Sequence, residues 1–318
     1  MSERDLPLWR RLRRRAWYAL AVAVASVAPG LPLGAGRRLG RTLAALGWRL
    51  RGAERRIAEA NVAAALPELG PAARRSLLMA AVARLGENLH DALCAPALAP
   101  RPGFVAFEAS GGGADLAGQL AALTAKGRGV LILTGHLGCW ELLGTWLARA
   151  VPAAGCGPLA VVTGTVRNPA VDRLVQGRRR AAGLVVLPRE GGPGPLVRHL
   201  AAGGVAAVLL DQDLGVPSLD VPFFGRRART PIGFGRLVLQ RGVPVLPMAI
   251  GRQGEGHVVR SLPPLCWDPD PAAARDPRRV AAVLARCNEA LETLVRRNPA
   301  EWVWFHDRWN DRTRKDRT

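Results

Sequence analysis

The most informative segment of this sequence is Gly129-Val130-Leu131-Ile132-Leu133-Thr134-Gly135-His136-Leu137-Gly138-Cys139-Trp140-Glu141. Its first five residues form a short, continuous apolar run, which is typical of a strand buried on both faces of a parallel sheet. A turn with two glycines follows, and the pattern then becomes helical over Leu142–Ala150. Functional sites in α/β sheets form where such strands end. The segment therefore predicts both an α/β fold and the position of its site.

Strand and helix patterns alternate on both sides of this segment. Further short apolar strands are expected at Phe104–Phe107, Leu159–Thr163, Leu184–Leu187, Val205–Leu210 and Val245–Ile250. Helices are expected at Asp115–Lys126, Ala170–Ala182, Pro195–Ala202, Pro231–Arg241 and Val280–Arg297, and residues 37–95 are predicted to be helical. This order predicts an α/β fold with a mixed, mostly parallel sheet flanked by helices.

The composition limits the kind of protein and the kind of partner. The 318 residues are 49% hydrophobic and 22% charged, which excludes a disordered or collagen-like chain. Basic residues outnumber acidic ones by 45 to 25, and because Lys126 and Lys315 are the only lysines, 43 of the 45 are arginine. Guanidinium groups pair well with phosphates and carboxylates, so we expect an anionic partner such as nucleic acid, anionic lipid or an acidic carrier. The five scattered cysteines form no CxxC pair, which argues against a disulfide framework or a zinc site and indicates a reducing compartment.

Half of the excess positive charge lies near the amino terminus. Residues 1–56 hold thirteen arginines and three acids, and several of these arginines precede an apolar stretch from Ala16 to Ala28. Thirteen helical residues extend about 20 Å, less than the roughly 30 Å hydrocarbon core of a bilayer. A cleaved signal peptide, a single span and a soluble helix are the alternatives. We expect an uncleaved helical segment that lies on or dips into an anionic membrane surface.

The residue pair most suited to catalysis is His136 and Glu141. Residues five apart do not share a helix face, so we place His136 in the glycine turn and Glu141 in the first helical turn, from which it can reach the imidazole. A carboxylate bound to one ring nitrogen leaves the other nitrogen to remove a proton from a hydroxyl. The alternatives are a helix-capping histidine with a surface glutamate, and a nucleophilic Cys139.

Two further polar clusters are candidate binding residues. Asp211 and Asp213 follow the strand at Val205–Leu210, and they could hold an arginine or substrate hydroxyls. Two acids alone also suggest a metal, but no other ligand spacing supports one, so we predict no metal site. The second cluster contains Arg167 and Asn168 and continues into the arginines at 178–180, which could bind phosphates or form a solvated helix face.

The order of the motifs resembles a known family. The motifs in question are Asn61 with Pro67-Glu68-Leu69, Gly135-His136 with Trp140-Glu141, Arg167-Asn168-Pro169, Asp211-Gln212-Asp213, Phe223-Phe224-Gly225, Thr230-Pro231 and Pro299-Ala300-Glu301-Trp302-Val303-Trp304-Phe305-His306 with Arg308-Trp309. Together they resemble the late acyltransferases of lipid A biosynthesis, the lauroyl/myristoyl family of the lysophospholipid acyltransferase-like fold. The resemblance extends over roughly residues 10–310, and the ordered set is far more specific than the HxxxxE motif alone.

This resemblance implies a membrane-bound transferase. It would move a fatty acyl group from an acyl-carrier-protein or CoA thioester to a hydroxyl of a lipid A precursor, without a cofactor. His136 would be the general base and Glu141 its partner, while Arg167, Asn168, Asp211 and Asp213 would bind substrate. The site would face the cytoplasm at a bacterial inner membrane, and the chain would divide into a membrane segment (1–36), an acyltransferase domain (37–310) and a charged tail (311–318).

Other functions remain as alternatives. The same chemistry could act on a phospholipid or a mannosylated phosphoinositide, because related acyltransferases share much of the pattern. A nucleic-acid-binding protein is disfavoured, since the sequence shows no aromatic-rich RNA motif and no helix-turn-helix signal. A catalytically inactive membrane scaffold is disfavoured by the intact pair of His136 and Glu141.

Overall fold

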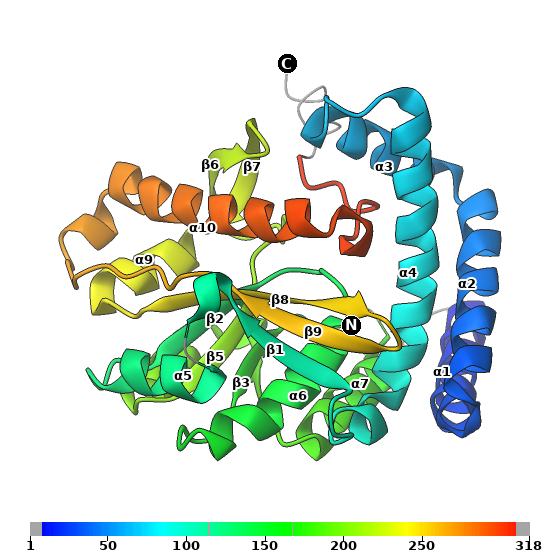
Figure 1. The fold of residues 1–318 in the computed structure, drawn as a ribbon, viewed down its shortest axis with the longest axis horizontal. Helices are drawn as coiled ribbons and strands as arrows, with labels where there is room; N and C mark the ends of the chain where they lie inside the picture. Colours follow the sequence, from blue (N-terminus) through cyan, green and yellow to red (C-terminus); the bar gives the residue numbers. More distant parts are fainter. Residues whose placement is uncertain (1–7, 114, 167, 310–318) are drawn as a thin grey trace.

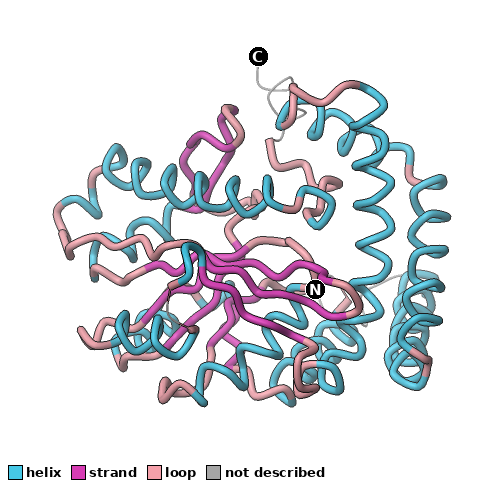
Figure 2. The backbone as a smooth tube through the Cα atoms, viewed as in Figure 1, coloured by secondary structure: helices cyan, strands magenta, loops and turns pink. Residues whose placement is uncertain are grey.

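The fold is built around one seven-stranded sheet. The computed structural model describes residues 8–113, 115–166 and 168–309. In spatial order the strands of the sheet are β1 (Val105–Ala109), β9 (Gly256–Ser261), β8 (Val245–Gln253), β2 (Val130–Thr134), β5 (Val205–Leu209), β3 (Ala160–Thr163) and β4 (Val185–Pro188). Figure 2 shows this sheet between two layers of helices.

Most strands run in the same direction. The strands β8, β2, β5, β3 and β4 are parallel, whereas β9 turns back antiparallel to β8 and pairs in parallel with β1. The prediction of a mixed, mostly parallel sheet flanked by helices is therefore confirmed. The central strand β2 is buried along its whole length, as its uninterrupted apolar sequence predicts.

Helices cover both faces of the sheet (Figure 1). One face packs against α5 (Leu116–Thr124) and α6 (Trp140–Ala153), and the other against α9 (Ile232–Arg241) and α10 (Pro277–Arg297). The helices α7 (Pro169–Ala181) and α8 (Gly194–Ala201) precede β4 and β5, respectively.

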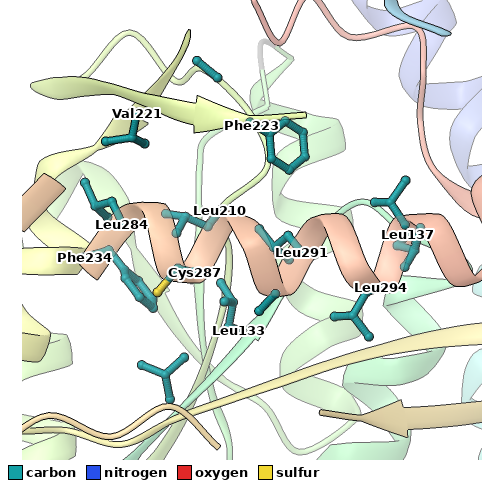
Figure 3. Close-up of a cluster of buried hydrophobic side chains, with 14 of the residues drawn as sticks. Leu133, Leu137, Leu210, Val221, Phe223, Phe234, Leu284, Cys287, Leu291 and Leu294 are labelled. Atoms are coloured by element: carbon teal, nitrogen blue, oxygen red, sulfur yellow. The ribbon is translucent and has the colours of Figure 1, made fainter. Parts of the chain in front are cut away.

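Helix α10 packs along the larger core. Its apolar residues recur at helical spacing, and Figure 3 shows Leu284, Cys287 and Leu291 on the helix beside Leu133 and Leu210, the latter directly after β5. This packing fixes the ends of β2 and β5 against a rigid helix.

A small hairpin, which the sequence analysis missed, closes the α10 side. It consists of β6 (Ser218–Phe223) and β7 (Arg226–Pro231), which form a separate two-stranded antiparallel sheet next to α10. The buried Asn288 of α10 ties the hairpin down, because its Nδ2 donates to the Pro222 carbonyl at 2.9 Å and to the Thr230 hydroxyl at 3.3 Å.

Four helices precede the sheet and lie beside it. They are α1 (Leu8–Val27), α2 (Leu33–Leu50), α3 (Gly52–Ala65) and α4 (Pro71–Leu98), and Figure 1 shows α2 running along α4. The two helices touch at Gly40 and Gly86, where a Cβ on Gly40 would lie 2.2 Å from the Gly86 carbonyl oxygen. Among the helices in the described part of the chain, none combines the length and the apolar character that crossing a bilayer requires.

A buried charged cluster fastens α2 and α4 to the sheet. The carboxylate of Asp91 on α4 accepts two hydrogen bonds from Arg37 at 2.9 and 2.8 Å, one from Arg252 at 2.8 Å and one from His257 at 2.8 Å. Burial would raise the pKa of Asp91, but the hydrogen bonds from His257 and Arg37 and the charge of Arg252 outweigh it and hold this pKa well below its usual value. Asp91 is therefore an internal carboxylate that links α2, α4, β8 and β9.

Candidate active site

The ends of β2 and β5 bring His136 and Asp211 together. The last residues of the two parallel strands, Thr134 and Leu209, are register partners, and His136 and Asp211 each follow two residues later. The His136 Nδ1 atom lies 2.9 Å from Asp211 Oδ1, and the His136 backbone N–H donates to Asp211 Oδ2 at 2.7 Å. The carboxylate thus holds both the ring and the backbone of His136.

Two glycines make this close approach possible. A Cβ on Gly135 would lie 2.8 Å from Asp211 Oδ2, inside van der Waals contact. Gly138 has a φ of 63°, and a Cβ there would meet the Ile250 carbonyl oxygen at 1.9 Å. The turn that carries His136 therefore requires glycine at both positions.

The closing segment, residues 299–309, braces the same turn from the other side. The Trp302 indole N–H donates to Asp211 Oδ2 at 2.8 Å. The Gly138 N–H donates to the Glu301 carbonyl at 2.9 Å, and the Val303 N–H donates to the His136 carbonyl at 3.2 Å. The closing segment is itself held by Asn61 of α3, whose Nδ2 donates to the carbonyls of Trp304 and His306 at 2.9 and 2.8 Å.

The electrostatics of the pair keep Asp211 ionised. Burial alone would raise the pKa of Asp211, but the charge of His136 and the hydrogen bonds from His136 and Trp302 lower this pKa to about 2. Burial also lowers the pKa of Arg308 to about 10, so its guanidinium remains charged at neutral pH. Burial lowers the pKa of His306 as well, and Asp211 and His136 are close enough to influence it.

The second ring nitrogen of His136 is available. The side chain is 24% exposed, and Nε2 makes no hydrogen bond to any residue in the described ranges. With Nδ1 held by a carboxylate, Nε2 can accept a proton from a bound hydroxyl, as in other histidine general bases. The arrangement therefore suits proton abstraction.

The predicted contact between Glu141 and the imidazole is wrong. The carboxylate of Glu141 instead forms an ion pair with Arg179 of α7, with Arg179 Nε 3.2 Å from Oε2 and a second contact between Arg179 Nη2 and Oε1. Asp211 occupies the position that we assigned to Glu141, because its strand is the direct neighbour of β2. Whether Glu141 takes part in catalysis stays a prediction.

Glu141 and Arg179 line one edge of an apolar cavity. The cavity has a volume of about 370 Å³ and lies between α1, α4, α6 and α7. Its apolar wall includes Leu20, Val24, Leu93, Leu174 and Val175. Such a cavity, with a few polar groups at one edge, has the size and composition of a ligand pocket.

The other predicted binding residues lie in different surroundings. Asp213 is nearly buried, with Oδ2 3.4 Å from Arg229 Nε and Oδ1 accepting from the Gly215 N–H at 3.1 Å. Asn168 caps α7 by accepting from the Ala170 N–H at 3.1 Å, and it donates to the Arg14 carbonyl on α1 at 3.0 Å. Arg167 lies outside the described residues. The substrate-binding roles of these three residues remain predictions.

The arginines at 178–180 are partly engaged by the protein. Arg178 donates to the Leu93 carbonyl at 2.5 Å, while Arg179 pairs with Glu141. Two of the three guanidinium groups thus hold α7 against α4 and α6. Their proposed contact with a phosphate stays a prediction.

Other candidates from the sequence are structural. Cys139 is buried, its Sγ donates to the Asn88 carbonyl at 3.4 Å, and burial raises the pKa of its thiol far above the usual value, so it is not a nucleophile. The side chains of Trp302, Trp304 and Trp309 in the closing segment are buried in an aromatic cluster with Phe223. Within the described ranges no group of three or more His, Cys, Asp or Glu residues gathers as it would around a metal ion.

Trp302 contacts Asp211 in the candidate site, but the sequence analysis assigned it no role there. Its motif was noted, but nothing in the local pattern indicates which side chain its indole N–H reaches. The pairing of Asp211 with His136 had a readable signal, because both residues directly follow buried strands. Strand order, which makes those two strands neighbours, was the missing information.

Comparison with known proteins agrees with the motif order. Residues 7–311 match the family described as "Bacterial lipid A biosynthesis acyltransferase". The chain is 25% identical over 187 residues to a phosphatidylinositol mannoside acyltransferase of Mycolicibacterium smegmatis (58% of this chain, 57% of that protein). It is 26% identical over 203 residues to the protein of the same name from Mycobacterium tuberculosis (62% and 59%). It is also 29% identical over 161 residues to a lipid A biosynthesis acyltransferase of Haemophilus influenzae (50% and 48%).

These matches identify the family of the chain, but the relatives are named for two different lipid substrates. The chain spans less than two thirds of the length of each of these curated relatives. The family match, in contrast, covers nearly the whole chain and confirms the resemblance predicted from the ordered motifs. The chain belongs to the bacterial lipid A biosynthesis acyltransferase family.

Proposed function

We propose that this protein transfers a fatty acyl group from a thioester donor to a hydroxyl of a glycolipid, with His136 as the general base. The observation that carries the proposal is the His136–Asp211 pair with its open Nε2. Five residues further along the chain, Glu141 lines an apolar cavity. Family membership supports the acyl-transfer class.

The chemistry balances without a cofactor. His136 Nε2 accepts the proton of the acceptor hydroxyl, and the oxygen attacks the thioester carbonyl carbon. An ester C–O bond forms, the C–S bond breaks, and the departing thiolate takes the proton from the imidazolium. Asp211 holds the ring in the tautomer with hydrogen on Nδ1 and stabilises the imidazolium while it exists.

The apolar cavity is the candidate site for the acyl chain. It opens beside Glu141, five residues after His136, and its lining is almost wholly hydrocarbon. The ion pair of Glu141 with Arg179 fixes one edge of this cavity. We therefore propose that Glu141 acts by positioning Arg179 beside the donor, while Asp211 serves the imidazole.

The acceptor is the less defined substrate. The family is named for lipid A, whereas the mycobacterial relatives are named for phosphatidylinositol mannosides. We propose a lipid A precursor as the acceptor and a mannosylated phosphoinositide as the alternative. Both carry phosphate and sugar hydroxyls, which suits a chain with a net charge of +20. The same charge suits an acidic acyl-carrier protein as the donor, with acyl-CoA as the alternative.

The N-terminal helices support a membrane-bound reaction. Nearly all large apolar side chains exposed in the described ranges lie on α1, α2 and α4; those on α1 and α2 are Trp9, Leu12, Trp17, Tyr18, Leu20, Val24, Val27, Leu39, Leu43, Leu46 and Leu50. Apolar side chains among arginines are typical of helices that lie in the interface plane of a bilayer. We propose that α1 and α2 rest on the cytoplasmic face of a bacterial inner membrane.

A transfer assay with two donors and two acceptors tests this function. Membranes that contain the protein would receive labelled acyl-carrier-protein or acyl-CoA thioesters, together with a phosphorylated lipid A precursor or a phosphatidylinositol mannoside. Label should move to the lipid A precursor, and His136→Ala should abolish the transfer. Transfer to the phosphatidylinositol mannoside alone would identify that lipid, and not the lipid A precursor, as the acceptor. Transfer by a folded His136→Ala protein would overturn the proposed mechanism.

Glu141→Gln separates positioning from proton transfer in the same assay. Glutamine keeps the size of the side chain but removes the charge that pairs with Arg179. We expect the KM for the thioester to rise several-fold with a smaller change in kcat. A loss of kcat as large as that of His136→Ala would assign Glu141 to the chemical step instead.

A further inference from the structure

A second cavity lies between α2, α3 and α4. It has a volume of about 520 Å³, and we call it the basic crevice. Two arginines from α3, Arg55 and Arg56, and two from α4, Arg74 and Arg75, line it, opposed by the single carboxylate of Glu59. A concave surface with four guanidinium groups and one carboxylate is suited to an anion with several oxygens.

The guanidinium groups are largely uncommitted. Arg56 and Arg75 are exposed and make no ion pair with a residue in the described ranges, and Arg55 is 4.0 Å from Glu59, the limit of an ion pair. Arg74 donates to the Pro67 carbonyl through Nη2, but its Nε is buried without a hydrogen-bond partner in the described part of the chain. A buried donor without a partner is costly, which indicates that a further acceptor belongs in the crevice.

The backbone adds to the positive potential. Pro71, Arg74 and Arg75 belong to the first turns of α4, a helix of 28 residues. This first turn holds no acidic residue, and Gly70 supplies no side-chain cap. The helix N-terminus therefore directs unpaired N–H groups and a partial positive charge toward the same region as the four arginines.

The other side of the crevice is apolar. Trp48, Leu78 and Met79 line it, and Trp48 packs edge-on against Phe305 of the closing segment with ring centroids 5.6 Å apart. A ligand here would meet guanidinium groups at one end and hydrocarbon at the other.

We propose that the basic crevice binds the phosphate headgroup of a membrane lipid, with the arginines on the phosphate oxygens and the lipid chains along Trp48 and Met79. The inference rests on the proposed function in one respect, namely that α2 lies on the membrane. Inorganic phosphate offers the same oxygens, but it would leave the apolar side of the crevice without a partner. The headgroup is therefore the assigned ligand.

Vesicle flotation with a matched pair of variants tests the assignment. The vesicles are phosphatidylcholine with 10 mol% phosphatidic acid, at about 0.15 M salt so that long-range attraction is screened. The test variant is Arg56→Gln with Arg75→Gln. The control is Arg278→Gln with Arg279→Gln, which removes two exposed arginines from the first turn of α10 and so changes net charge equally.

The expected result is at least tenfold weaker vesicle binding for the crevice variant and less than twofold for the control, with unchanged melting temperatures in both. Equal weakening in the two variants would overturn the proposal, because net charge alone would then account for binding. Inorganic phosphate at 10 mM should leave the difference intact, and its disappearance would overturn the lipid assignment in favour of a free-phosphate site.

The readout separates this inference from the proposed function. Flotation needs no acyl transfer, so a protein that proves inactive on every acceptor still tests the crevice. Conversely, full transfer activity with equal vesicle binding by both variants would refute the crevice and leave the proposed function standing. The Arg56→Lys, Arg75→Lys variant should recover only part of the binding, because lysine restores the charge but not the two-pronged contact with phosphate.

Discussion

The protein contains two aspartate–histidine pairs with nearly the same bond and opposite surroundings. His136 lies 2.9 Å from Asp211, and His257 lies 2.8 Å from Asp91. The His136 side chain is 24% exposed, whereas those of His257 and Asp91 are wholly buried. Asp91 also forms ion pairs with Arg37 and Arg252, so its negative charge is balanced by arginines and serves to hold α2 and α4 to the sheet.

The difference teaches that a hydrogen bond to a carboxylate does not by itself make a histidine a catalyst. Burial lowers the pKa of His257 despite Asp91, and its Nδ1 is enclosed with no partner among the described residues. His136 has the same carboxylate support but an open Nε2. Access for a hydroxyl, together with a carboxylate not neutralised by arginine, distinguishes the proposed catalytic pair from the structural one.

The largest expected effect comes from removing one histidine of each pair. His136→Ala should lower kcat for acyl transfer about a thousandfold, because a general base typically contributes about 10² to 10⁴. His257→Gln should keep most of the activity but lower the melting temperature, since its role is to bind Asp91. If folded His136→Ala and His257→Gln proteins lost kcat to a similar extent, the proposed difference in role between the two pairs would be refuted.

Asp91→Asn should act on stability. Removing one member of a buried ion-pair cluster costs about 3 kcal/mol, because Arg37 and Arg252 lose their counter-charge. The pKa of Asp91 is lowered in the folded protein, so its contribution to stability is fully present above about pH 4 and is lost as the pH falls below that value. Denaturant unfolding at about pH 7 and about pH 2, compared with wild type, measures both effects. Wild-type stability at pH 7 in the variant would contradict the structural role.

Asp211→Asn should leave the fold and reduce the chemistry. Asparagine would donate toward His136 Nδ1 and favour the wrong tautomer, so kcat should fall about a hundredfold. Asp220→Asn is the matched control, because it makes the same substitution at an exposed aspartate of β6 that is not among the predicted site residues. If the control loses as much activity as Asp211→Asn, the special role of Asp211 is refuted.

Trp302→Phe is the substitution with the smallest expected effect, and it tests how the support of Asp211 contributes to the His136–Asp211 pair. It removes only the indole N–H that Asp211 accepts, and we expect a decrease in kcat of about tenfold, equivalent to about 1.4 kcal/mol. Trp309→Phe removes a similar N–H that donates to the Phe223 carbonyl, at 3.1 Å, and should affect stability more than kcat. Steady-state kinetics on both variants would reveal whether the orientation of Asp211 matters for turnover.

The sequence was sufficient for the central architecture. The apolar run of β2, the two glycines and the helix that follows are local signals, and each appears in the structure where the pattern predicts it. The hairpin of β6 and β7 escaped prediction because Arg226, Arg227 and Arg229 interrupt its apolar pattern, and because its other side packs on α10 rather than within a sheet. β9 escaped because its apolar run is only Val258 and Val259, between Gly256-His257 and Arg260-Ser261.

The site was predictable in its residues but not in its pairing. His136 and Asp211 were both chosen because they follow buried strands, yet Glu141 was preferred as the partner because it is near in sequence. Seventy-five residues separate His136 from Asp211, and only the adjacency of β2 and β5 joins them. Local spacing carries no information about strand order, so a partner across the sheet could not be inferred from it.

The wide sequence separation of the site has a consequence for how the protein acquires activity during folding. Contacts between His136, Asp211 and Trp302 join three distant parts of the chain, and non-local contacts of this kind form late because long loops must close first. Burial of the sheet and docking of the closing segment must therefore precede the competent arrangement. A partly folded molecule that already holds β2 and its glycine turn would therefore still lack the His136–Asp211 contact on which the proposed activity depends.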